Sequence, residues 1–207
     1  MFEIRPVRAD DLDALYRLAL ATGDGGADAA ALYRDPKLLG HIYVAPYAVL
    51  CPDTVFVAED ADGMAGYIVG AADTRAFEAR LDAEWWPTFR QAYPDPVDVP
   101  QVDRTLDQRR SHTIHHPRRT PTDITDTYPS HLHINLLPRL RGRGVGRALM
   151  DRWLVAIGEK GSTGVHLAVG MRNARALRFY AAYGFRELTQ VPRLAPDAVW
   201  LGITWGA

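Results

Sequence analysis

A glycine-rich turn between a predicted strand and a predicted helix constrains this chain more than any other segment. Residues 133–136 end a strand, Gly142, Gly144 and Gly146 follow, and an amphipathic helix is predicted over 144–160. Glycines leave the backbone bare, so several amide N–H groups can point into one concavity. That concavity lies at a helix N-terminus, where partial positive charge favours anions. The segment therefore predicts a cradle that holds a diphosphate without a metal ion.

Two familiar phosphate-binding patterns do not fit this turn. A dinucleotide-binding fold needs G-x-G-x-x-G early in a βαβ unit, whereas these glycines are spaced two apart and lie about two-thirds of the way along the chain. A P-loop needs Lys-Ser or Lys-Thr after its last glycine, and neither pair occurs. The remaining pattern is Arg141-x-x-Gly144-x-Gly146, and the alternative is a turn with no ligand.

A second informative segment, 173–185, predicts a short helix with both ends marked. Asn173 is suited to cap its N-terminus, and Gly184 suits the left-handed residue that closes a helix. Ala176, Phe179 and Tyr180 share one face of it. Tyr180 on that face is either a core aromatic with a satisfied hydroxyl or a functional group.

Both segments resemble signatures of the GCN5-related N-acetyltransferase (GNAT) superfamily. Arg141-x-x-Gly144-x-Gly146 resembles its coenzyme A pyrophosphate motif Q/R-x-x-G-x-G/A, and residues 173–185 fill every defining position of N-x-x-A-x-x-F-Y-x-x-x-G-F. Residues 128–138 and the long segment before them further resemble bacterial acetyltransferases similar to the C-terminal acetyltransferase-like domain of O-GlcNAcase. The resemblance implies acetyl-CoA as cosubstrate and direct acetyl transfer in a ternary complex.

The resemblance also implies roles for individual residues. Asn173 would contact the pantetheine arm of acetyl-CoA, and the Tyr180 hydroxyl would protonate the departing thiolate. Main-chain groups of Leu136 and Leu137 would pair with pantetheine, and an N–H there could polarise the thioester carbonyl. The predicted cofactor-binding residues are Leu136, Leu137, Arg141, Gly142, Arg143, Gly144, Val145, Gly146, Arg147, Asn173 and Tyr180.

The general base is less evident from the sequence. Many GNAT relatives place a carboxylate early on the fourth strand, and that position falls near Ser130 here. The candidate substitutes are His133, His131 and Asp126, acting directly or through water, because an ordinary histidine titrates near physiological pH. We therefore predict Tyr180, His133 and Asp126 as the catalytic residues.

The order of predicted elements matches the mixed α/β GNAT fold, with a central, mostly antiparallel, splayed sheet flanked by helices. We expect one acetyltransferase domain over 1–207, with a long insert at 73–130 between the third and fourth strands. Strands are predicted at 2–8, 54–59, 64–71, 131–137, 164–169, 185–191 and 198–205. Helices are predicted from Asp10 to about residue 21, in one or two pieces over 28–50, and at 76–92, 144–160 and 173–182.

The insert is too aromatic to be a disordered linker, since it contains Trp85-Trp86, Phe89, Tyr93 and Tyr128. We expect either an ordered lid on the acceptor side of the site, or a structural or dimer-forming element. The arginine pairs 109–110 and 118–119 could bind an anion, but a solvated, acid-paired surface is the favoured interpretation.

Histidines raise the question of a metal. Five of the seven lie between His112 and His133, and His131 and His133 share one strand face. No cysteine or acid completes a conventional zinc spacing around that pair, so we predict no metal.

Composition limits the partners and the cellular location that we expect for the protein. A net charge of −1 argues against a dedicated nucleic-acid partner. No long apolar run predicts a membrane span, and the N-terminus lacks the apolar core of a signal peptide. The single cysteine, Cys51, suits a reducing compartment, so we expect a cytoplasmic protein.

We therefore predict an acetyl-CoA-dependent N-acetyltransferase that acts on an unidentified amine of a small molecule or a protein, with a homodimer as one assembly. The alternatives are a CoA-binding pseudoenzyme and an interaction domain that works through the insert.

Overall fold

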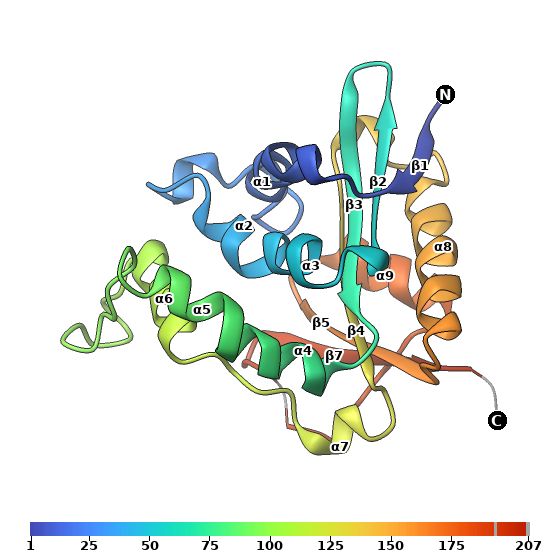
Figure 1. Cartoon of the computed structure of the whole chain (residues 1–207). Coiled ribbons are helices and arrows are strands. Elements are labelled where there is room, and N and C mark those ends of the chain that lie inside the picture. Colours follow the sequence, from blue (N-terminus) through green and yellow to red (C-terminus); the bar gives the residue numbers. More distant parts are fainter. Residues whose placement is uncertain (193, 206–207) are drawn as a thin grey trace.

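The computed structural model describes residues 1–192 and 194–205 and has one seven-stranded sheet at its centre (Figure 1). The strands lie in the order β1-β2-β3-β4-β5-β7-β6, and each neighbouring pair is antiparallel except β4 and β5. This arrangement confirms the predicted fold class. The strand bounds are β1 Glu3–Pro6, β2 Val55–Asp60, β3 Gly63–Ala71, β4 Ser130–Leu136, β5 Gly164–Gly170, β6 Arg186–Glu187 and β7 Ala198–Thr204.

Helices cover both faces of the sheet. Buried side chains of α8 pack on one face with Ile68 and Leu132, and α1 and α3 pack on the other with Val57 and Val69. The α-helices are α1 Leu12–Ala21, α2 Leu38–Tyr43, α3 Ala45–Leu50, α4 Thr74–Arg80, α5 Trp86–Phe89, α6 Leu106–His115, α7 Thr122–Thr125, α8 Val145–Glu159 and α9 Ala174–Tyr183. None of the helices in the described part of the chain is long and apolar enough to cross a membrane.

The sheet is split between β4 and β5. These two seven-residue strands pair only at Ser130 with Val165 and at His131 with His166. The other edge of β5 is paired with β7 along its whole length, from Gly164 to Gly170. Beyond His131 the two strands therefore diverge, which leaves one edge of β4 open in the middle of the molecule.

Several helices and strands begin or end at residues other than those predicted, for local reasons. The expected cap Asp10 lies in a 3-10 turn, Ala9–Asp11, and α1 begins after it because Asp11 accepts hydrogen bonds from Arg8 N–H and from Arg5. The strand expected at 185–191 shrinks to β6, which pairs at two positions only. Pro46 lies in the first turn of α3 instead of breaking a helix, since a proline there forfeits no helical hydrogen bond.

The insert is helical and closely packed. A continuous run of helix spans 74–89, with a π-helical segment, Leu81–Trp85, between α4 and α5. Trp85 and Trp86 are buried against Tyr16 and Ile114. Helix α6 packs against α2, whereas α7 lies apart from both α2 and α3 (Figure 1). The sequence reasoning missed α6. Its signal was the Thr105-x-x-Gln108 capping box, in which each side chain bonds the other residue's backbone N–H.

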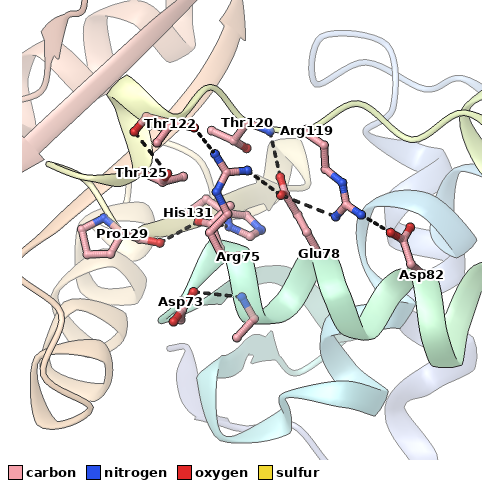
Figure 2. Close-up of polar contacts among 12 residues, drawn as sticks. Asp73, Arg75, Glu78, Asp82, Arg119, Thr120, Thr122, Thr125, Pro129 and His131 are labelled. Atoms are coloured by element: carbon pink, nitrogen blue, oxygen red, sulfur yellow. Dashed lines mark hydrogen bonds and ion pairs between the residues drawn. The ribbon is translucent and has the colours of Figure 1, made fainter.

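Polar contacts tie the beginning of the insert to its end (Figure 2). The Glu78 carboxylate on α4 accepts hydrogen bonds from Arg75, at 2.9 Å, and from the Thr120 N–H, at 2.8 Å. Arg119 lies 3.6 Å from the same carboxylate and also pairs with Asp82. These contacts hold the two stems of the insert together next to the start of β4.

Candidate active site

A cleft of about 380 Å³ opens at the split in the sheet. It is bounded by β4, the glycine-rich turn, helix α9 and the loop that follows α1. Its walls are formed by Thr22, Gly26, Ile134, Asn135, Leu136, Arg141, Gly142, Gly144, Gly146, Arg147, Asn173, Arg175, Ala176, Phe179 and Tyr180.

The glycine-rich turn and the start of α8 carry a row of unpaired amide groups, and four of their residues, Gly142, Gly144, Gly146 and Arg147, line the cleft. Arg141 N–H still donates to the Pro138 carbonyl, and the next main-chain donor with a backbone acceptor is Ala148, which bonds Gly144. Among the described residues, no acceptor pairs with the six N–H groups from 142 to 147. Three of them belong to the first turn of α8, where no earlier carbonyl of the helix is available to accept a hydrogen bond. The arrangement has the geometry expected of the predicted anion cradle.

The three glycines serve different needs. Gly142 and Gly144 have φ of +71° and +80°, a left-handed conformation that other residues adopt at a cost. Gly146 is already helical, but a Cβ there would lie 3.3 Å from Phe179 Cε2 and 3.4 Å from Leu136 Cδ1. The first two glycines shape the turn, and the third lets α8 approach α9.

Positive charge surrounds the cradle. Arg141, Arg147 and Arg175 line the cleft. Arg141 donates through Nε to the Leu136 carbonyl, at 3.0 Å, and also bonds the Gly26 carbonyl. Burial, and then the charge of Arg175, lower the pKa of Arg141. Arg175 was not predicted, because it occupies a variable position of the second motif.

The open edge of β4 has usable main-chain groups at alternate residues. Leu137 N–H donates to the Ala65 carbonyl, at 2.7 Å, and the Leu137 carbonyl accepts from Leu140, so Leu137 cannot pair with pantetheine as expected. Bonded and non-bonded pairs alternate in an antiparallel ladder. The main-chain groups of Leu136 and Ile134 therefore point away from β3 and into the split. The Leu136 carbonyl already accepts from Arg141, so Leu136 offers its N–H there. Ile134 takes the place that we had given to Leu137.

Helix α9 positions the tyrosine. The Asn173 side chain accepts a hydrogen bond from Ala176 N–H at 3.1 Å, and Gly184 closes the helix with φ of +114°, as predicted. Tyr180 lines the cleft and packs against Phe179 and Phe185, with ring centroids 5.3 Å apart in each pair. Burial raises the pKa of Tyr180, so its hydroxyl remains protonated. Within the described chain no residue hydrogen-bonds that hydroxyl.

The histidines of β4 lie on the strand face that also carries Asn135. His131 is fully engaged, with Nε2 2.8 Å from the Tyr47 hydroxyl and Nδ1 2.8 Å from Thr74 Oγ1. The His133 imidazole contacts the rings of Tyr43 and Tyr47. Burial lowers the pKa of His133 to about 4, so this imidazole is neutral at neutral pH.

The predicted residues are not all brought together. Leu136, Arg141, Gly142, Gly144, Gly146, Arg147, Asn173 and Tyr180 line the cleft, whereas Leu137, Arg143, Val145, His133 and Asp126 do not. The Val145 side chain is fully buried in the core, and Arg143 is exposed and donates to the Arg139 carbonyl. Asp126 is exposed at the end of α7, so the structure gives it no place beside Tyr180.

The structure also locates Ser130 and the two arginine pairs of the insert. Ser130, near the position where the resemblance implies a carboxylate, is fully buried and donates to the Ala72 carbonyl at 2.6 Å. The arginine pairs lie outside the cleft lining. Arg119 pairs with acids, which agrees with the favoured interpretation of a solvated, acid-paired surface. Arg110 departs from it, because this side chain is half-buried and bonds the hydroxyls of Tyr33 and Tyr43.

Known proteins share these features. The model of the acetyltransferase (GNAT) domain family matches residues 119–187, which include the turn and α9. Protein O-GlcNAcase of Rattus norvegicus is 24% identical over 203 residues, which cover 98% of this chain and 22% of that protein. The chain thus spans about a fifth of the length of the curated relatives it matches.

Solved structures extend the likeness to the whole chain. The crystal structure of SsHAT is 37% identical, with a TM-score of 0.89, and the match covers 98% of each chain. The structure of yncA from Salmonella typhimurium, solved with its cofactor acetyl-CoA, is 15% identical over 98% of this chain and 93% of that one, with a TM-score of 0.58, and supports the fold. Both predicted resemblances are confirmed, and the chain belongs to the GNAT superfamily of acetyl-CoA-dependent acyltransferases.

Proposed function

We propose that the protein transfers an acetyl group directly from acetyl-CoA to an amine. One observation carries the proposal: a turn with unpaired N–H groups, an open strand edge and a protonated tyrosine hydroxyl border one cleft. The N–H groups from 142 to 147 would hold the pyrophosphate, with Arg141, Arg147 and Arg175 adding charge. The edge of β4 at Ile134 and Leu136 would pair with the pantetheine amides.

The chemistry then follows from what amide formation requires. The neutral amine nitrogen attacks the thioester carbonyl carbon, the C–S bond breaks, and the electron pair leaves with the sulfur. Tyr180 donates its proton to that sulfur, and the N–H of Ile134 or Leu136 stabilises the carbonyl oxygen as it gains charge. The proton released by the amine restores the Tyr180 phenol through solvent.

His133 is our proposed base, and it acts through water. It is neutral and belongs to the strand that borders the cleft. A pKa of about 4 makes His133 a weak base. It would therefore not deprotonate an ammonium group before the reaction, and would take up a proton only briefly, from the nitrogen that becomes positively charged as the neutral amine attacks. Asp126 is not proposed, because it lies outside the cleft lining and, at the end of α7, belongs to no element that borders the cleft.

The acceptor would enter from the side of the cleft formed by the loop after α1, with the packed insert, 73–130, as a fixed wall behind it. The sites for both substrates would then belong to one domain over 1–207. The acceptor is a small amine or a protein amine, and a homodimer through the insert remains one assembly to be measured.

Calorimetric titration with acetyl-CoA tests the cleft. Gly144→Glu forces a side chain and a negative charge into the cradle, and we expect it to abolish micromolar binding by a folded protein. Gly161→Glu is a matched control, because Gly161 has nearly the same φ, +83° against +80°, and no atom within 4 Å of either Cβ, but lies outside the cleft. Equal binding by the two variants would refute the proposed cradle.

A second candidate function is CoA binding without catalysis, and the buried Ser130 in place of a carboxylate favours it. Turnover separates the two functions. The release of CoA thiol with a panel of amines, with N-acetyl products identified by mass spectrometry, would support the enzyme. Acetyl-CoA binding without any product in the panel would favour the pseudoenzyme.

A further inference from the structure

Three side chains with metal-binding atoms converge at the outer part of the insert. Asp95 lies between α5 and α6, His112 belongs to α6, and His116 follows its last residue. His112 Nδ1 lies 3.4 Å from Asp95 Oδ1, and His116 Nε2 lies 2.5 Å from Asp95 Oδ2. All three donor atoms lie within 4.8 Å of one another. None of these residues lines the acetyl-CoA cleft.

The backbone around Asp95 is already fixed to α6. His115 Nε2–H donates to the Tyr93 carbonyl at 2.7 Å, and the Ser111 hydroxyl donates to the Pro94 carbonyl at 2.5 Å. Three consecutive residues, 93 to 95, thus each contact the same helix. The carboxylate is held against two imidazoles, one in the last turn of α6 and one on the residue that caps it, whose N–H donates to the His112 carbonyl at 2.8 Å.

We propose that Asp95, His112 and His116 bind one Zn²⁺ ion and so fasten the connection at 90–105 to α6. Two imidazole nitrogens and one carboxylate oxygen form a conventional zinc ligand set, with water in the fourth position. In a tetrahedral site, donor atoms are separated by about 3.3 Å. His112 Nδ1 already lies at about this distance from Asp95 Oδ1. His116 Nε2 lies closer, 2.5 Å from the other oxygen, Oδ2, so its imidazole must shift when one carboxylate oxygen serves as the ligand.

The exposure of the three side chains permits both that movement and the entry of an ion. The exposed fractions are 37% for His112, 21% for Asp95 and 51% for His116. The hydrogen bonds that fix Tyr93 and Pro94 do not involve the three ligands. The ion would therefore replace only the bonds between Asp95 and the two imidazoles.

These ligands differ from the histidine pair that we considered in the sequence. His131 and His133 had no third ligand, and the structure commits His131 to Tyr47 and Thr74. The acid that completes the proposed site precedes His112 by 17 residues. Asp95 reaches the histidines because the chain turns back along α6, so no local spacing in the sequence predicted this contact.

Calorimetric titration of the full chain with ZnCl₂ at pH 7.5 tests the site, using protein without a polyhistidine tag and freed of metal by EDTA. We expect saturable binding of one ion. Each of His112→Ala, His116→Ala and Asp95→Asn should weaken binding at least tenfold, and the double substitution His112→Ala with His116→Ala should abolish it.

His115→Gln is the matched control, because it removes the neighbouring imidazole but keeps a donor for the Tyr93 carbonyl. It should bind Zn²⁺ as the parent protein does, and Zn²⁺ should raise the melting temperature of both but not of the double variant. Circular dichroism in EDTA verifies that each variant is folded. The absence of saturable binding by the parent protein, or undiminished binding by the double variant, would overturn the proposal.

Discussion

The Asn135 side chain donates a hydrogen bond to the Thr22 hydroxyl, at 2.6 Å, and thereby joins β4 to the end of α1 across 113 positions of sequence. Thr22 in turn donates to the Leu18 carbonyl at 2.7 Å, and both Thr22 and Asn135 line the cleft. The bond therefore sets the position of one cleft wall relative to the open strand.

Loss of this bond should weaken acetyl-CoA binding. We expect Asn135→Ala and Thr22→Val each to raise the dissociation constant about fivefold, since one such hydrogen bond contributes about 1 kcal/mol. Thr22→Ser keeps the hydroxyl and should bind as the parent does. Calorimetry on the double variant checks the coupling: losses that simply add would mean that the bond does not position the wall.

Arg175 should contribute to affinity through the phosphates of CoA. We expect Arg175→Ala to weaken CoA binding about tenfold, an effect that falls at high salt because it is electrostatic. Arg178→Ala, an exposed arginine of the same helix outside the cleft, is the control. Pantetheine, which lacks the phosphates, should bind both variants equally. A loss of affinity in Arg175→Ala that persists with pantetheine would contradict this role.

Tyr180→Phe should lower kcat about 100-fold and leave the acetyl-CoA dissociation constant unchanged, because the hydroxyl acts on the leaving thiolate. Tyr183→Phe is the matched control, since the Tyr183 hydroxyl bonds Asp151 and lies outside the cleft lining. Burial raises the pKa of Tyr180, so its proton should cause no fall in kcat up to pH 10. A kcat of Tyr180→Phe equal to that of the parent would remove Tyr180 from the mechanism.

Acid should destabilise the fold through its buried histidines. His166 Nδ1–H donates to the Tyr128 carbonyl at 2.7 Å, and burial lowers the pKa of His166 to about 4. Between the unfolded pKa near 6.5 and this folded value, the unfolded chain binds a proton that the folded chain refuses. Stability is therefore complete above about pH 6.5 and falls as the pH drops towards 4, by on the order of 3 kcal/mol for this histidine.

His166→Asn removes the titrating group and keeps an amide donor near the Tyr128 carbonyl. Urea unfolding at pH 7 and pH 4.5 should show a smaller difference in the free energy of unfolding for this variant than for the parent. An identical difference would show that His166 does not contribute to acid sensitivity.

The Glu78 carboxylate should stabilise the stems of the insert. It is buried and serves both Arg75 and the Thr120 N–H, so Glu78→Gln should cost about 2 kcal/mol of unfolding free energy. Asp82→Asn changes an exposed partner of Arg119 and should cost less than 1 kcal/mol. Chemical denaturation measures both free energies of unfolding. Equal losses in the two variants would mean that the burial of Glu78 does not increase its contribution to stability.

Features that depend on neighbouring residues were predictable from the sequence. Asn173 caps α9 and Gly184 ends it because a side-chain acceptor and a left-handed residue act within one helical turn. The row of unpaired N–H groups follows in the same way from Gly142, Gly144 and the start of α8. The fold class followed from the order of strands and helices, together with the two motifs.

Features that depend on distant segments were not predictable. Leu137 lost its expected role because Ala65 takes its N–H, and Arg175 faces the cleft only because α9 packs beside the glycine turn. Helix α6 carried a capping box but was not among the predicted helices.

The sequence by itself therefore determined the conformation of the glycine turn and the identity of the family, because both reside in short motifs whose geometry is local. Only the tertiary structure decided which main-chain groups remain free along β4, where Thr22 meets Asn135, and how Asp95 reaches two histidines. Those relationships depend on the divergence of β4 from β5 and on the packing of the insert, which bring together residues that no spacing in the chain relates.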